Sequence, residues 1–181
     1  MTFAPHRSAP WAWRKFAVSA TLCLAALSVH GPAVTAPLVA GSALPTLTLK
    51  DQHDKPVAIP PDTRWVLFSA EKSVSDMVGS VLSAEPAGAM GRAHLVYVAD
   101  ISAMPALMTR MFALPKLREL PYSIALVREA ADLAQVADIP RQAGAATLLR
   151  VDNGRITQVT AVGNAADLRA ALALAPAKTA P

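Results

Sequence analysis

Three short apolar runs, separated by amphipathic helical patterns, constrain the fold of this chain most strongly. RWVLFS at 64–69, AHLVYVA at 93–99 and YSIALV at 122–127 are rich in β-branched and aromatic residues and predict buried strands. Between the first two runs, apolar residues recur over 74–82 at the i, i+3, i+4 and i+7 spacing of a helix. The same spacing recurs over 104–112, after the second run. Strands that alternate with helices in this way predict an α/β fold with a mixed sheet.

Two hairpin patterns flank this central region. LPTLTLKDQHDKPVAI at 44–59 alternates around a polar centre, and predicts two strands joined by the turn DQHDK. TLLRVDNGRITQVTA at 147–161 predicts a second hairpin, because Asn153 and Gly154 supply the positive φ angles of a tight turn.

The remaining segments predict short helices and loops. A closing helix is expected over 164–174, with Asn164 as its N-cap and Asp167 facing its positive end. EPAGAMG at 85–91 predicts a loop by its Pro and Gly, and 130–139 predicts a helical turn or a short helix.

The order of these elements resembles the thioredoxin-like superfamily, in its peroxiredoxin and cytochrome-maturation branch. The segment 44–59 is similar to the N-terminal hairpin of that branch, and RWVLFSAEKSVSDMV at 64–78 is similar to its strand, active-site corner and first long helix. The segment 144–172 looks like the C-terminal half of such a domain. The resemblance implies a three-layer α/β fold, with a central mixed β-sheet flanked by helices.

The chain departs from this family at the redox corner. Ser73-Val74-Ser75-Asp76 stands where the family has its CxxC, and Ala146 stands where the family has a cis-proline. Thiol exchange requires a thiolate that attacks a disulfide sulfur, and a serine hydroxyl cannot replace it. The resemblance therefore implies a redox-inactive member with degenerate corner positions Ser73, Asp76 and Ala146, and no catalytic residue.

Ser73 and Asp76 also have a purely local interpretation. A serine followed three residues later by an acid, just before an apolar stripe, predicts a capping box at a helix start. The alternative is a polar recognition spot inherited from a redox corner. Ser73 is not expected to be a nucleophile, because no histidine is close to it in sequence.

Residues 1–36 predict a secretory signal peptide. Three bases and no acid precede the short apolar run FAVSATLCLAAL at 16–27, and small residues follow it. The expected cleavage positions are Ser28, Ala33 and Ala36. The apolar run is shorter than the roughly 20 residues of a membrane span. The alternative is an uncleaved N-terminal anchor. Beyond the leader we expect a short linker at 37–43, one domain at 44–174 and a disordered tail at 175–181.

Charge and cysteine usage change once the leader is removed. The leader carries 3 of the 17 bases and none of the 13 acids, which leaves 14 bases, 13 acids and a net charge of +1. The basic character of the whole chain is therefore no argument for nucleic-acid binding. The single cysteine, Cys23, lies in the leader. An exported chain without it has no disulfide, no thiolate nucleophile and no thiolate metal ligand.

The helical stripe over 104–112 is methionine-rich and has two interpretations. Met104, Met108 and Met111 share it with Leu107 and Phe112. An apolar stripe of this kind commonly packs into the core. Methionines also form adaptable binding surfaces, and in that case Met104, Met108, Met111 and Phe112 would contact a partner.

No metal or cofactor is expected. His53 lies in the polar turn DQHDK and predicts a solvated turn, while His94 begins a strand and is expected at its rim. These ligands are too few for a zinc site. The sequence shows no GxGxxG after a strand, so a dinucleotide cofactor is not expected.

These observations favour a non-catalytic, exported thioredoxin-like domain, periplasmic or secreted, that binds or assists another cell-envelope protein. One alternative is a redoxin-type oxidoreductase that uses a non-thiol group or a flavin. Another is a structural domain tethered by an uncleaved N-terminal anchor. No nucleic-acid partner and no membrane span in the mature chain are expected.

Overall fold

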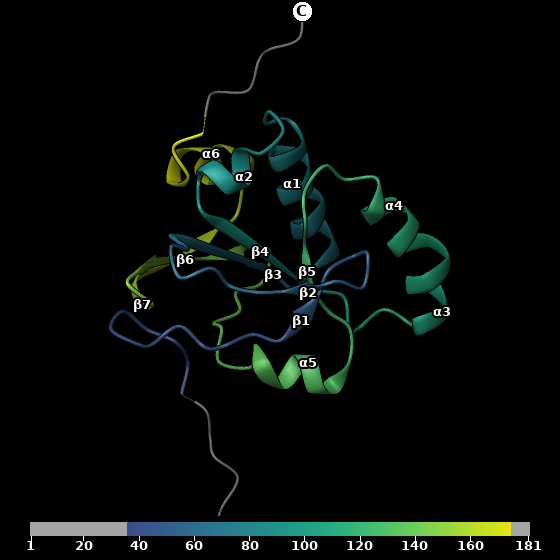
Figure 1. The fold of residues 1–181 in the computed structure, drawn as a ribbon, viewed down its shortest axis with the longest axis horizontal. Coiled ribbons are helices and arrows are strands. Elements are labelled where there is room, and N and C mark those ends of the chain that lie inside the picture. The colour runs from purple at the N-terminus through teal and green to yellow at the C-terminus, as the bar shows by residue number, and fades with distance from the viewer. Residues whose placement is uncertain (1–35, 175–181) are drawn as a thin grey trace, which may run out of the picture. The chain divides into compact units, whose positions relative to one another are not determined.

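The computed structural model describes residues 36–174, which form a seven-stranded mixed sheet with helices on both faces (Figure 1). In spatial order the strands are β2 (Pro56–Val57), β1 (Leu49–Lys50), β5 (Ala125–Val127), β4 (Leu95–Asp100), β3 (Trp65–Ser69), β6 (Ala146–Asp152) and β7 (Arg155–Val162). The three central strands β5, β4 and β3 run parallel, and the strands outside them pair antiparallel. The predicted α/β fold with a central mixed sheet is confirmed.

The helices form two outer layers around the sheet. They are α1 (Lys72–Ser83), α2 (Ala89–Arg92), α3 (Ala106–Met108), the π-helical η1 (Thr109–Ala113), α4 (Leu114–Arg118), α5 (Ala130–Gln135) and α6 (Ala165–Ala171). Helices α1, α2 and α6 cover one face and α5 covers the other, as the three-layer prediction requires (Figure 1). The expected loop at 85–91 is interrupted by the single turn of α2.

Strand residues alternate between two hydrophobic cores, one on each face of the sheet. On β3, Leu67 packs toward α1 and α6, while Val66 and Phe68 pack on the α5 side. On β4, Tyr97 lies in the first core and Val98 in the second. This two-sided burial explains why the central strands read as continuous apolar runs rather than as alternating ones.

The C-terminal half matches its sequence prediction closely. Asn153 and Gly154 have φ angles of 49° and 73°, which make the tight turn between β6 and β7. The Asn164 side chain accepts the Asp167 backbone N–H at 2.9 Å and caps α6. Both predictions are confirmed.

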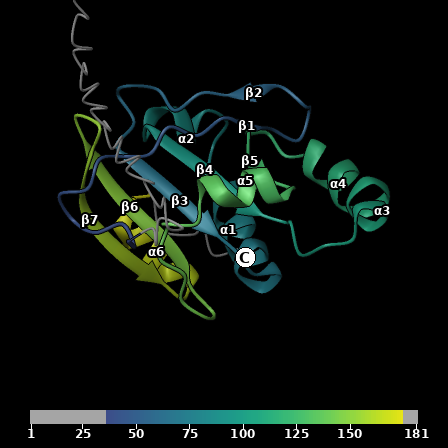
Figure 2. The same cartoon turned by 90° about the horizontal axis from the view of Figure 1, so that it is seen from below.

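Helix α3, η1 and α4 form one continuous helical segment, Ala106–Arg118, at the end of the sheet opposite β7 (Figures 1 and 2). The helix continues through Pro115, which has no N–H to donate. The π-helical turn ends at Ala113, two residues before this proline. We call this segment, Ala106–Arg118, the peripheral helix.

The segment 37–43, expected as a linker, packs on the domain in the structure. Leu38 is buried in the core on the α5 side, and its N–H donates to Asp138 O at 2.8 Å. Ala43 pairs with Arg155 at the start of β7. A buried leucine and a strand-like pairing fix this segment, so the folded unit begins earlier than expected.

Two predictions concern residues outside the described part of the chain. The predicted signal peptide, which contains Cys23, spans residues 1–36, and all of it except Ala36 lies outside the described residues. The expected tail, 175–181, also lies outside them. Within 36–174, no helix has the length and apolar character that crossing a membrane requires.

Candidate functional site

The corner between β3 and α1 differs from its predicted capping arrangement. Helix α1 begins at Lys72, with Glu71 as its N-cap, so Ser73 is the second helical residue rather than the cap. The Asp76 carboxylate accepts from Lys72 Nζ at 2.5 Å across one turn of the helix. The predicted Ser73–Asp76 capping box is therefore wrong, because the extended backbone of Glu71 already marks the helix start.

Glu71 links this corner to the segment that leads into β6. Its Oε1 accepts the Gly144 N–H at 3.1 Å, two residues before the buried Ala146. This hydrogen bond joins the start of α1 to the segment just before β6. Ser73 and Asp76 are exposed on α1, whereas Ala146 is fully buried in the core below. A redox-derived role for these three positions stays a prediction.

A hydroxyl cluster lies beneath the corner. Ser69 Oγ is 2.8 Å from both Ser75 Oγ and the Tyr97 hydroxyl. Burial raises the pKa of Tyr97, although its hydrogen bond to Ser69 acts in the opposite direction. The phenol stays protonated at neutral pH, so the cluster satisfies buried hydroxyls and supplies no anionic nucleophile. No local sequence pattern predicts this cluster, because Ser69 and Tyr97 lie on different strands.

The methionine-rich stripe faces solvent. The exposed fractions of Leu107, Met108, Met111 and Phe112 are 67%, 47%, 59% and 61%. We name these four residues the exposed apolar face. Met104, just before the helix, is half-buried. The core interpretation is wrong for the exposed apolar face, because this helix contacts the core with its other side.

That other side carries a second, partly apolar stripe. Thr109 and Leu114 are buried, and Leu117 packs against the core on the α1 side. Four large apolar side chains exposed next to one another on a single helix are unusual on a monomeric surface and are typical of an interaction site.

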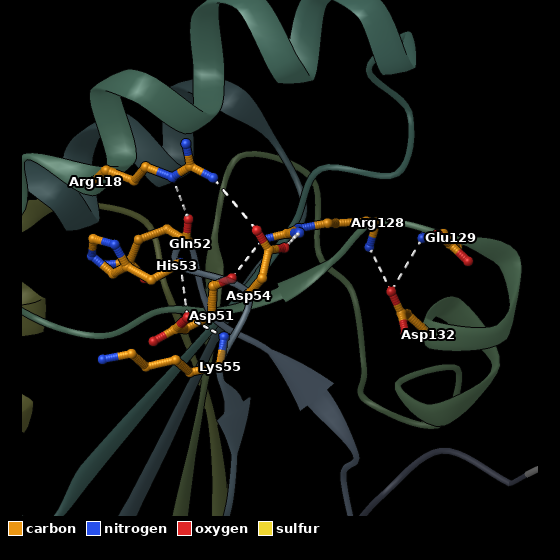
Figure 3. A network of polar contacts seen from close by, with 9 residues as sticks. All are labelled: Asp51, Gln52, His53, Asp54, Lys55, Arg118, Arg128, Glu129 and Asp132. Atoms are coloured by element: carbon orange, nitrogen blue, oxygen red, sulfur yellow. Dashed lines mark hydrogen bonds and ion pairs between the residues drawn. The ribbon is translucent and has the colours of Figure 1, made fainter.

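A polar network fixes the β1–β2 turn beside this helix (Figure 3). Asp54 Oδ1 accepts from Arg128 at 2.6 Å, and its Oδ2 accepts from Arg118 at 3.4 Å. Arg118 also donates to Gln52 O at 2.8 Å, and Arg128 donates to Asp51 O. The turn residue Asp54 has a φ of 63°, and His53 beside it is exposed. Two arginines from separate elements therefore hold the turn in place.

Helix α5 begins with a capping box next to the same network. The Asp132 carboxylate accepts the N–H groups of Arg128 and Glu129 at 3.0 and 3.2 Å, while the Glu129 side chain accepts a backbone N–H of the first turn (Figure 3). The carboxylates of Glu129 and Asp132 thus both accept backbone N–H groups at the start of α5.

A cavity of about 550 Å³ lies between this network and the peripheral helix. We name it the basic cavity. Its charged lining residues are Lys50, Asp54, Arg110, Arg118, Arg128, Glu129 and Asp132. Leu114 and Leu126 also line it. Arg110 and Leu114 belong to the same helix as the exposed apolar face, so the two features adjoin.

The two histidines lie apart from any metal-like cluster. His94 Nδ1 is 2.7 Å from Asp62 Oδ2, at the rim of β4. Among residues 36–174, no group of three or more His, Cys, Asp or Glu side chains is placed to hold a metal ion.

Comparison with known proteins identifies the fold. No protein-family model and no curated protein matches the chain. Its structure is similar to peroxidoxin BcpB from Mycobacterium tuberculosis, with 14% identity, coverage of 75% of this chain and 95% of that one, and a TM-score of 0.50. It is also similar to a candidate protein disulfide isomerase from Bacteroides thetaiotaomicron, with 15% identity, coverage of 75% and 87%, and a TM-score of 0.51. The chain has a thioredoxin-like fold.

Acid pH is expected to weaken the polar network. The hydrogen bond and charge of Arg128 hold the pKa of the Asp54 carboxyl below its ordinary value of 3.8. Because the folded-state pKa is the lower one, the ion pairs stabilise the fold above about pH 4 and lose this contribution as pH falls through the folded-state pKa. Urea unfolding at pH 7 and at pH 3 measures the loss.

The variant Asp54→Asn removes the titrating group and should show a smaller loss of stability on acidification than the wild type. Asp152→Asn, at the exposed β6–β7 turn, is the matched control and should keep the wild-type loss. Equal losses in wild type and Asp54→Asn would show that the network does not titrate as described.

Proposed function

We propose that this chain is an exported, non-catalytic thioredoxin-like domain that binds another protein of the cell envelope through the exposed apolar face. The observation that carries the proposal is the 47–67% exposure of Leu107, Met108, Met111 and Phe112 on one peripheral helix. Burial of these side chains by a partner would remove apolar surface from water, at about 25 cal/mol per Å².

The corner supports the non-catalytic part of the proposal. The chain has no cysteine after Cys23, and the hydroxyls of Ser69, Ser75 and Tyr97 bond to one another. Serine and tyrosine form no disulfide with a substrate, so thiol–disulfide exchange has no attacking group here.

A comparative capture experiment tests partner binding. The protein recovered from the envelope is immobilised beside a variant with Met108→Ser, Met111→Ser and Phe112→Ser, and both are exposed to detergent-solubilised native envelope. We expect at least one protein to be retained by the wild type and lost by the variant. Identical sets of retained proteins would contradict binding through the exposed apolar face.

Redox assays test the enzyme alternative. Insulin reduction and peroxide consumption by the protein recovered from the envelope should stay at the level of a boiled control, because no thiolate is present after Cys23. Adding a flavin should not change this result. Turnover above the boiled control in either assay would favour a redoxin-type oxidoreductase with a non-thiol group or a flavin.

Export with cleavage is the remaining part of the proposal. Its support is the basic, apolar and small-residue order of residues 1–36. The intact mass of the protein from the envelope should correspond to cleavage after Ser28, Ala33 or Ala36. A mass that matches the full chain, with Cys23 present, would favour the tethered alternative.

A further inference from the structure

The peripheral helix carries positive charge beside its exposed apolar face. Within Ala106–Arg118 the charged residues are Arg110, Lys116 and Arg118, with no acid among them. All three are exposed, and Arg110 and Arg118 line the basic cavity. A basic amphipathic helix of this kind is typical of surfaces that bind acidic segments or anionic membranes.

The acids that line the basic cavity are already engaged. Asp54 is held by Arg118 and Arg128, and Asp132 and Glu129 cap α5. Within residues 36–174, Lys50 and Arg110 form no ion pair, and the buried Arg128 Nε has no hydrogen-bond partner. The cavity therefore presents cationic donors that its own carboxylates do not satisfy.

We propose, resting on the proposed function, that the partner contributes an acidic amphipathic protein segment. Its apolar side lies on the exposed apolar face, and its carboxylates reach Lys50 and Arg110, which line the basic cavity, and Lys116 on the peripheral helix. Charge complementarity selects an acidic segment over a neutral or basic one.

The shape of the site favours a protein segment over a lipid surface. The basic cavity is a hollow of about 550 Å³ beside the helix, and Lys50 enters it from β1 rather than from the helix itself. Glutamate side chains on a neighbouring segment can reach into such a hollow, whereas a flat bilayer meets only the outermost side of the helix.

Three synthetic 18-residue peptides test this inference. They share one apolar stripe and a hydrocarbon staple that equalises their helicity, and they carry Glu, Gln or Lys on both flanks of the stripe. Each is titrated by fluorescence anisotropy into the protein recovered from the envelope. We expect the Glu peptide to bind roughly fivefold more tightly than the Gln peptide, since each ion pair that its carboxylates form with Lys50, Arg110 or Lys116 adds a small contribution to binding.

Two variants locate the charges. Arg110→Ala with Lys116→Ala should remove most of the preference for the Glu peptide, while Lys72→Ala on α1 should leave it unchanged. The preference should also shrink as salt rises. Vesicles with anionic lipid headgroups serve as the competing probe.

The outcomes separate the two proposals. Equal binding of the Glu and Gln peptides, both lost in the Met108→Ser, Met111→Ser and Phe112→Ser variant, would overturn the acidic partner and leave the proposed function standing. Anionic vesicles that bind through Arg110 and Lys116 while no peptide binds would also overturn it. Failure of the envelope capture experiment, in contrast, contradicts the proposed function itself.

Discussion

Replacing Gln52 by alanine is expected to lower the free energy of unfolding by about 2–4 kcal/mol, since each buried polar group left without a partner costs about 1–3 kcal/mol. The Gln52 side chain is 1% exposed and bridges the β1–β2 turn to the chain before β5. Its Nε2 donates to Tyr122 O at 2.7 Å, and its Oε1 accepts the Ile124 N–H at 3.0 Å. The alanine variant leaves both backbone groups unpaired.

Urea unfolding followed by circular dichroism measures this loss. Gln158→Ala is the matched control, because Gln158 is exposed on β7 and its side chain, among residues 36–174, bonds only to Thr160, so its change should stay within about 0.5 kcal/mol. A loss below about 1 kcal/mol for Gln52→Ala would show that the bridge contributes little to the fold.

Two substitutions one turn apart on the peripheral helix are expected to behave in opposite ways. Leu114 is 8% exposed and lies in the core on the α1 side, so Leu114→Ala should cost about 2–4 kcal/mol of unfolding free energy. Met111 is 59% exposed, so Met111→Ala should change stability by no more than about 0.5 kcal/mol. Thermal and urea unfolding of the two variants supply the comparison.

The pair tests which side of the helix meets the core. If Met111→Ala costs as much as Leu114→Ala, then the methionine-rich stripe packs inward and no exposed apolar face exists. The expected result instead leaves Met111 free to contribute to binding without contributing to folding, which is the signature of an interaction residue.

The sheet could be predicted because its signals are local. Each central strand buries both faces and therefore reads as a continuous apolar run, such as RWVLFS. The turn at Asn153 and Gly154 needs positive φ angles, which few other residue pairs supply. Asn164 predicts the start of α6, because an asparagine side chain can cap the first turn of a helix.

The orientation of the peripheral helix could not be predicted from its sequence. Met108, Met111 and Phe112 follow helical spacing, but Leu114 and Leu117 supply a second apolar stripe on the opposite side. Periodicity shows that a helix is amphipathic and does not show which of two apolar sides meets the sheet. The position of the helix at the end of the sheet decides this, and that position is a tertiary property.

The polar network around Asp54 could not be predicted from the sequence either. Asp54 meets Arg118 and Arg128 across 64 and 74 residues of chain. The sequence showed only a polar turn, DQHDK, with nothing to indicate which distant arginines would hold it. The predicted capping box at Ser73 is wrong for a local reason. The N-cap of α1 is Glu71, two residues before the predicted one, so Ser73 lies inside the helix.

The central claim, that the exposed apolar face binds a partner in the envelope, is tested most directly by photo-crosslinking in intact cells. Benzoylphenylalanine is placed at position 112 on the face, and at position 158 on the exposed surface of β7 as the control. We predict light-dependent adducts of a defined size at position 112 alone, which disappear when Met108 and Met111 are replaced by serine. Adducts of the same size and yield at both positions, or at position 158 alone, would contradict the claim.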